Sequence, residues 1–215
     1  MSRYVSQLRK FAEGRGTGHF ADYKPWITTE EFNSRGTCSG YPDPIHGRSI
    51  QLLSQGELKA YLYLRWNDKV VDIREQFPLP MYSTFAIARA KGFDHPVRNG
   101  ELQVMTTDML VDLKDGRHLA VSCKPDANKL SDRDNEKITI ESLYWKKART
   151  KFVLFETNRI SKLLACNILD VFQYYDESKV HDSFSKAKHL VATKELKVNM
   201  KEVINWAAII RRNNL

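Results

Sequence analysis

Three charged residues, Glu57, Asp108 and Lys124, are the set in this sequence best suited to chemistry. Asp108 stands near the start of a predicted strand over residues 106–113, and Lys124 ends the next predicted strand, residues 118–124. The turn-forming sequence LKDGRH joins the two strands, so both residues lie at the same end of a predicted hairpin. Glu57 lies on a helix predicted earlier in the chain, so two acids and a lysine are expected in one neighbourhood.

Two carboxylates and a lysine suit the hydrolysis of a phosphodiester. This bond resists attack because the phosphate is anionic and the alkoxide is a poor leaving group; divalent metal ions activate a water and neutralise the leaving oxygen. Mg²⁺ prefers oxygen ligands and keeps several of its waters, so a few carboxylates suffice to hold it. A nearby lysine can orient the water or stabilise the crowded transition state. Acid–hairpin–lysine arrangements also arise by chance, so the pattern alone is a weak signal.

Each of these residues also has a purely structural interpretation. Glu57 completes an S-x-x-E capping box with Ser54. Asp108 can end a strand as a solvated residue, and Lys124, just before a proline, can be a surface charge. Cys123 is expected to be a small buried apolar residue.

The hairpin turn decides whether Asp108 and Lys124 share a face of the sheet. A two-residue turn at 115–116 would place Asp108 opposite Cys123, and the two charged side chains would then point to opposite faces. The chemistry requires one face. We therefore predict a three-residue turn over residues 115–117, with a bulge and a positive φ at its second or third residue, which places Asp108 directly opposite Lys124.

The elements that must position these residues alternate between helix and strand. Such an order predicts an α/β fold, a mixed sheet flanked by helices, over a core of residues 49–160. Residues 81–103 are predicted to be a loop, with room for a short helix. The expected elements are a helix at 53–66, a strand at 69–80 ended by prolines, the hairpin strands, a helix at 131–148 and a strand at 151–156.

The two ends of the chain differ from this core. Residues 1–48 are rich in Gly, Pro and charge and are expected to be an arm, anchored by DYKPW and carrying short helices at 3–12 and near 28–34. Residues 161–215 show only helical patterns, at about 160–173, 182–193 and 199–211. The last part of this segment, from Lys186 to Leu215, is basic and has an apolar face, so the segment is expected to dock on DNA or on a partner protein. The alternative is a terminal helix that packs on its own core.

Composition limits the class of protein. The 215 residues are 42% hydrophobic and 28% charged, as in a globular protein, and carry a net charge of +8 with a pI of about 9.3. This balance favours an acidic partner such as DNA or RNA. Three widely spaced cysteines argue against a disulfide framework or a zinc site, and the six histidines, most of them expected at the surface, show no metal-binding spacing. No membrane span or signal peptide is recognisable, so a cytoplasmic protein is expected.

Longer motifs around the charged residues resemble the TnsA family of transposon endonucleases, members of the PD-(D/E)XK nuclease superfamily with a restriction-endonuclease-like fold. The stretch LLSQGELKAYLYLRWNDKVVDIREQFPL is similar to the helix and strand of that nuclease domain, and DYKPW to its N-terminal arm. TTDMLV…KDGRHLAVSCKP resembles the family's hairpin, and ESLYWKKARTKFVLFE its next helix and strand. The resemblance covers about residues 19–160.

The resemblance implies roles for individual residues. Glu57 would be a metal ligand on a helix, Asp108 would bind or bridge the metal ions, and Lys124 would be the active-site lysine. Cys123 would offer its main-chain carbonyl to the metal. Glu141 would support the site from behind the direct ligands. The metal implied is Mg²⁺, for which Mn²⁺ can substitute.

One position departs from the family pattern. The superfamily has an acid two residues before the lysine, where this chain has Ser122, a shorter and weaker metal ligand. The resemblance implies cutting of the 5′ strands at transposon ends in a prokaryotic cell, at the nucleoid, together with a DDE transposase, TnsB, and an AAA+ regulator, TnsC. Ser122 keeps an alternative open, a catalytically weak subunit that bridges transposase and regulator. An RNA-binding protein or a general repair nuclease would explain the charge but not the DIREQ segment.

Overall fold

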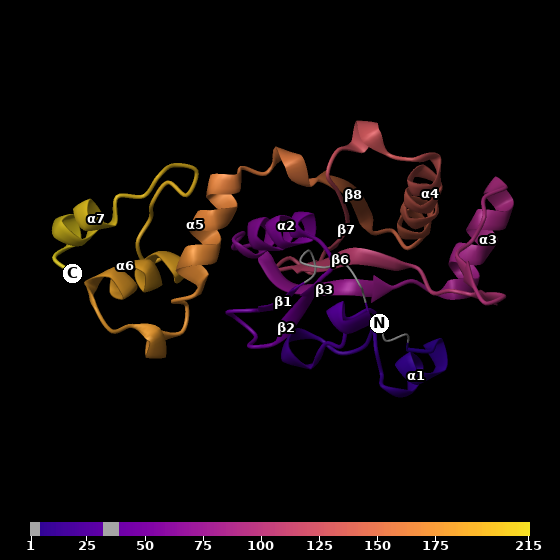
Figure 1. Cartoon of the computed structure of the whole chain (residues 1–215), viewed down its shortest axis with the longest axis horizontal. Helices are drawn as coiled ribbons and strands as arrows, with labels where there is room; N and C mark the ends of the chain where they lie inside the picture. The colour runs from indigo at the N-terminus through magenta and orange to yellow at the C-terminus, as the bar shows by residue number, and fades with distance from the viewer. Residues whose placement is uncertain (1–4, 32–38) are drawn as a thin grey trace.

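The computed structural model describes residues 5–31 and 39–215 (Figure 1). Its centre is a four-stranded sheet in the order β3-β6-β7-β8, in which β7 and β8 are parallel and the other neighbours antiparallel. The helices are α1 Gln7–Ala12, α2 Gln55–Arg65, α3 Met81–Lys91, α4 Asp132–Lys147, α5 Lys162–Phe172, α6 Ser183–Ala192 and α7 Trp206–Asn213. The strands are β1 Ser39–Pro42, β2 Ser49–Leu52, β3 Val70–Pro78, β4 Val97–Arg98, β5 Glu101–Leu102, β6 Thr106–Leu113, β7 His118–Lys124 and β8 Lys151–Glu156.

Helices cover both faces of the sheet, as the sequence predicted. Side chains alternate along the strands, so Met109 and Val121 face α2 and α5, whereas Leu110 and Ala120 face α3 and α4. Figure 1 shows α5, α6 and α7 gathered at one end of the molecule and α3 and α4 at the other. The predicted mixed sheet flanked by helices, with an N-terminal segment and C-terminal helices, is confirmed.

The hairpin has a three-residue turn, but it lies one residue earlier than predicted. Leu113 and Arg117 flank the turn, and Gly116 has a φ of +81°, which suits a type I turn followed by a bulge. The pairing of Asp112 with His118, continued along the strands, places Asp108 opposite Ser122, so the predicted pairing with Lys124 is wrong by two residues. Because the shift is an even number, Asp108 still shares a face with Lys124.

Two other regions differ from the sequence prediction. In the segment 81–103, predicted as a loop with room for a short helix, residues 81–91 form the three-turn helix α3. It begins after Pro80 and ends at Gly92, whose φ is +70°. Its apolar residues form no clear stripe, so the pattern did not reveal it. The arm forms a short ladder in which β1 pairs with β2, so the boundary predicted at residue 48 falls between two paired strands. The part of the helix predicted near 28–34 that follows Glu31, and Cys38, lie outside the described residues.

Side chains cap the outer edge of β3. The Arg65 guanidinium donates to the carbonyl of Val71 at 3.0 Å, and Arg48 donates to that of Ile73 at 2.5 Å. The hydroxyl of Tyr23, in the predicted DYKPW anchor, donates to the carbonyl of Glu75 at 2.9 Å. The carbonyls of alternate residues along this edge are therefore satisfied by the arm and α2 rather than by another strand.

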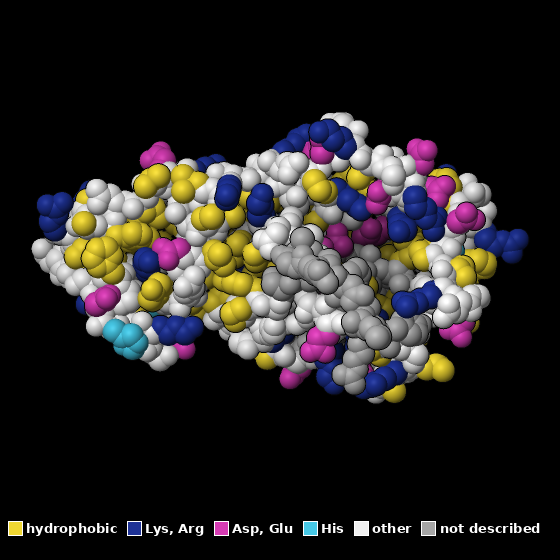
Figure 2. Space-filling view, viewed as in Figure 1, with side chains coloured by type: hydrophobic (Ala, Val, Ile, Leu, Met, Phe, Trp, Pro, Cys, Tyr) yellow, Lys and Arg dark blue, Asp and Glu magenta, His cyan; other side chains and the backbone are white. Residues whose placement is uncertain are grey.

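The C-terminal helices share the core of the sheet. Val191, Ala192 and Met200 are buried in the same cluster as α2 and α5, and the Lys194 ammonium lies 3.6 Å from the centroid of the Trp66 ring. In the view of Figure 2, apolar side chains also remain exposed over these helices. Among the described helices, none has both the length and the apolar character needed to cross a membrane.

Candidate active site

Glu57 stands in the first turn of α2, where the sequence allowed either a cap or a ligand. Its carboxylate accepts from the Leu53 amide at 2.9 Å and from the Ser54 hydroxyl at 3.1 Å, so the capping role is present. Gly56 lets this turn approach closely, since a side chain there would meet the Thr157 hydroxyl at 2.8 Å. Burial, with the nearby charge of Asp108, raises the pKa of Glu57 to about 7, which a cap alone does not explain.

Asp108 lies on β6 with its carboxylate directed at β7. Its Oδ2 accepts from the main-chain amide of Cys123 at 2.6 Å, which fixes the carboxylate beside Ser122 and Lys124. Burial raises the pKa of Asp108 in spite of this hydrogen bond. A solvated strand-end carboxylate would not be desolvated in this way, so the structural interpretation of Asp108 is the weaker of the two.

Lys124 ends β7 beside the parallel strand β8. Its ammonium forms an ion pair of 2.8 Å with Asp134 in the first turn of α4. The hydrogen bond from Lys124 lowers the pKa of Asp134 to about 2. Lys124 is therefore held at the site by a partner that the sequence analysis did not identify.

Glu141 lies on α4 and lines the same hollow as Asp108 and Lys124. A hollow of about 240 Å³ is lined by Asp108, Ser122, Lys124 and Glu141 among others. Burial raises the pKa of Glu141 to about 8, with the charge of Asp108 as the next cause. Its buried Oε1 has no hydrogen-bond partner among the residues that the structure describes. The structure thus brings together Asp108, Ser122, Lys124 and Glu141 around one hollow. Glu57, on α2, lies close enough to Asp108 for that charge to raise its pKa.

This donor set fits a hard divalent cation. Glu57, Asp108 and Glu141 are desolvated carboxylates, and within residues 5–31 and 39–215 none of them forms an ion pair with an arginine or lysine. Clustered anions of this kind favour an oxygen-binding cation, since burial raises the pKa of each carboxyl more than the surrounding groups lower it. The unpartnered Oε1 of Glu141 is a further oxygen donor at the site. Ser122, only 5% exposed, offers a hydroxyl where a carboxylate would bind more strongly.

A second group of possible metal ligands, His19, Asp72 and Asp112, lies elsewhere on the sheet. The histidines show no metal-binding spacing in the sequence, but folding brings His19 to the two aspartates. Asp112 already pairs with Arg74 at 2.7 Å and contacts His118 at 2.8 Å. Both carboxylate oxygens of Asp72 accept main-chain amides. Because these acids are satisfied, the group is explained as a structural network that ties the arm to the sheet.

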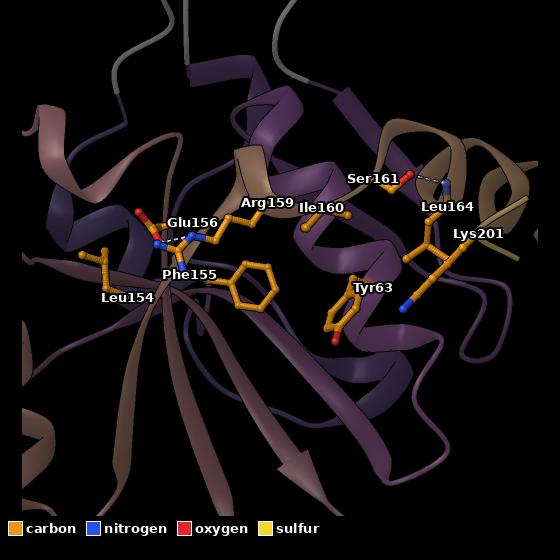
Figure 3. Close-up of a pocket in the computed structure, with 9 residues that line it drawn as sticks. All are labelled: Tyr63, Leu154, Phe155, Glu156, Arg159, Ile160, Ser161, Leu164 and Lys201. Atoms are coloured by element: carbon orange, nitrogen blue, oxygen red, sulfur yellow. Dashed lines mark hydrogen bonds and ion pairs between the residues drawn. The ribbon is translucent and has the colours of Figure 1, made fainter.

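A larger hollow of about 490 Å³ lies on the α2 and α5 side of β8 (Figure 3). Tyr63 and Phe155 project into it with ring centroids 5.6 Å apart. Its carboxylate, Glu156, is engaged by Arg159 and by the Ala127 amide. This hollow lacks the free carboxylates found around Asp108, so the hydrolytic chemistry is better placed in the smaller one.

Two residues of the site were missed by the sequence analysis. Gln76, at the end of the DIREQ segment, donates to Glu57 at 3.2 Å and is buried at 2% exposure. The segment itself was noticed, but a glutamine in a strand carries no sign of its partner. Asp134 was detectable as part of a helix start, since it follows the N-cap Ser131 by three residues and accepts from the Ser131 hydroxyl at 2.6 Å.

Comparisons with known proteins relate the chain to transposon endonucleases. Residues 67–157, which include Asp108, Lys124 and Glu141, match the family described as "TnsA-like endonuclease N terminal". The chain is also 41% identical over 166 residues to "Transposon Tn7 transposition protein TnsA" of Escherichia coli. That alignment covers 76% of this chain and 61% of the relative, so the chain spans less than two thirds of the relative's length.

Proposed function

Since this chain belongs to the TnsA-like endonucleases, we propose that it is a metal-dependent DNA endonuclease that cuts the 5′ strands at transposon ends during cut-and-paste transposition. The observation that carries the proposal is the hollow lined by Asp108, Lys124 and Glu141, with Glu57 close enough for the charge of Asp108 to raise its pKa. The proposal assigns the restriction-endonuclease-like fold of the PD-(D/E)XK superfamily to the core of residues 49–160.

The proposed metal is Mg²⁺, with Mn²⁺ as a substitute. The carboxylates of Glu57 and Asp108, the main-chain carbonyl of Cys123 and the hydroxyl of Ser122 would hold it, and Glu141 would support the site through its desolvated carboxylate. When bound, the ion supplies an activated water and neutralises charge on the leaving oxygen. Its affinity should be low in the absence of DNA, because Ser122 replaces an acid.

The residues of the chain divide the remaining work. Asp108 is held by the Cys123 amide, so its carboxylate faces a fixed point beside Lys124. Lys124 would orient the attacking water or bind the phosphate oxygens in the transition state. Asp134 keeps the ammonium at the mouth of the site until the phosphate arrives. Hydrolysis then adds water across the P–O bond and leaves a phosphate and a hydroxyl at the nick.

The proposed partners are transposon-end DNA, a DDE transposase of the TnsB kind that cuts and joins the 3′ ends, and an AAA+ regulator of the TnsC kind. The net charge of +8 supports an electrostatic contact with DNA in the cytoplasm, at the nucleoid of a prokaryotic cell. Residues 1–48 would form an arm and residues 161–215 the segment that docks on a partner or on DNA. Within that segment, α7 has no buried residue and offers such a surface.

The proposal is tested by strand-resolved cleavage of end-containing DNA. We expect 5′-strand nicks at the transposon end with Mg²⁺ and the DDE transposase, and little cutting by the chain alone, because no base-reading element is recognisable in the sequence. Mg²⁺ should also raise the melting temperature, since an ion that binds the folded state stabilises it. Assembly of the transposase with the regulator without any 5′ cutting would favour the architectural alternative that Ser122 keeps open.

A further inference from the structure

We propose that Gln76 is a positioning residue that fixes the Glu57 carboxylate relative to Asp108 and thereby sets the affinity of the site for its divalent cation. The inference rests on the proposed function, and concerns a residue to which neither the family motif nor the predicted site gives a role. Gln76 is buried at 2% exposure in β3, a strand that carries none of the predicted site residues.

The amide of Gln76 is oriented by a contact at each end. Its Nε2 donates to Glu57 Oε2 at 3.2 Å, and its Oε1 accepts from the Thr106 hydroxyl at 3.2 Å. An amide has one donating and one accepting end, so the Thr106 contact turns the donating end toward the carboxylate. A glutamate at this position would present an anion to Glu57 instead.

Gln76 provides a link between α2 and the sheet. The other donors to Glu57, the Leu53 amide and the Ser54 hydroxyl, lie next to α2 in the sequence and move with it. Among the described residues, Gln76 is the donor to this carboxylate that comes from the sheet. It lies opposite Asp108, between the pairs of Glu75 with Met109 and Phe77 with Thr107. Gln76 therefore lies beside Asp108 in the sheet, and its side chain extends to Glu57 on α2.

The backbone at Gln76 is held in an unfavourable conformation. Its φ is +47°, a left-handed value that a side chain with a Cβ rarely adopts, and the Trp26 amide binds its carbonyl at 3.2 Å. Strain of this kind persists where the surrounding structure requires it and is common at functional sites. A glycine would relieve the strain but would lose the bond to Glu57, so glutamine at this position is explained by its side chain.

The test uses two variants of the full chain, Gln76→Ala and Gln76→Gly. The matched control is Gln173→Ala, which changes an exposed glutamine directly after α5. The readouts are the Mg²⁺ concentration that half-saturates the rise in melting temperature without DNA, and the Mg²⁺ concentration for half-maximal 5′ cleavage. We expect both concentrations to increase by about tenfold or more in the two Gln76 variants and not in the control, as when a partner behind a metal ligand is lost. Excess Mg²⁺ should restore most of the cleavage rate.

The glycine variant separates positioning from stability. Without the left-handed strain it should melt no lower than Gln76→Ala, yet need the same excess of Mg²⁺. Gln76→Gly with a wild-type Mg²⁺ response would overturn the inference while leaving the proposed nuclease intact. A wild-type chain that shows neither a Mg²⁺-dependent rise in melting temperature nor 5′ cleavage would instead overturn the proposed function.

Discussion

Asp108→Asn should lower 5′-strand cleavage by about a thousandfold or more, while the protein remains folded and binds end DNA. Residues that act as one unit around a metal show near-complete losses when any one is removed. Asparagine keeps the shape of the side chain and an oxygen that can accept from the Cys123 amide. The substitution removes a negative charge. Burial raises the pKa of Asp108, so the ionised carboxylate destabilises the folded state at neutral pH. The melting temperature of Asp108→Asn should therefore stay the same or rise.

The matched control is Asp112→Asn, the same change on the same strand and face. Asp112 pairs with Arg74 and contacts His118 away from the hollow, so its loss should reduce stability and spare the cleaving step. Cleavage is measured on strand-labelled DNA, and binding by fluorescence anisotropy in Ca²⁺. Near wild-type cutting by a well-folded Asp108→Asn protein would remove Asp108 from the site.

Arg65→Met should lower the free energy of unfolding by about 3–5 kcal/mol, the usual effect of leaving one partner of a buried ion pair alone. Arg65 is 4% exposed and Asp43 3% exposed, with a contact of 2.8 Å between them. The same guanidinium donates to the Val71 carbonyl, which would also lose its partner. Urea unfolding measures the change, and the double variant Arg65→Met, Asp43→Asn should recover part of it, because no charge is left buried. A loss below about 1 kcal/mol, the level of an exposed pair, would show that this pair is not desolvated.

The same ion pair makes a prediction about pH. Burial alone would raise the pKa of Asp43, but the charge and hydrogen bonds of Arg65 outweigh it and hold that pKa below its ordinary value of 3.8. A carboxyl with a lowered pKa in the folded state contributes stability that is present above its ordinary pKa and is lost as the pH falls through the folded value. Wild-type protein should therefore lose this contribution only below about pH 4, and Arg65→Met should lack it at neutral pH.

Local patterns predicted most of the elements because each carried its own signal. The strands at 106–113 and 118–124 match the prediction, since β-branched and apolar residues are bounded by turn residues. The helix predicted at 131–148 begins after its capping Ser131. The arm and α3 were less visible because β1 and β2 are only four residues each and α3 lacks a clear stripe.

The site was only partly predictable, because its contacts join distant segments. Glu57, Asp108 and Lys124 follow from residue types and from the parity of the hairpin register, whereas Glu141 was named only through the family resemblance. The turn itself shifted by one residue, since Leu113 pairs across to Arg117 and leaves Gly116 to take the left-handed position. The hydrogen bond from Gln76 to Glu57 joins a strand to a helix across 19 residues of sequence. The spacing of apolar residues in the sequence does not predict such a contact.

The capped edge of β3 also limits self-association of this protein through its sheet. An open strand edge is a template on which another chain can add a strand. Here the carbonyls of Val71, Ile73 and Glu75 are occupied by Arg65, Arg48 and Tyr23, so a second molecule finds no free acceptor in that row. Arg48 and Tyr23 belong to the arm, so the arm, which has no predicted site residue of its own, shields this strand edge from pairing with a second copy of the chain.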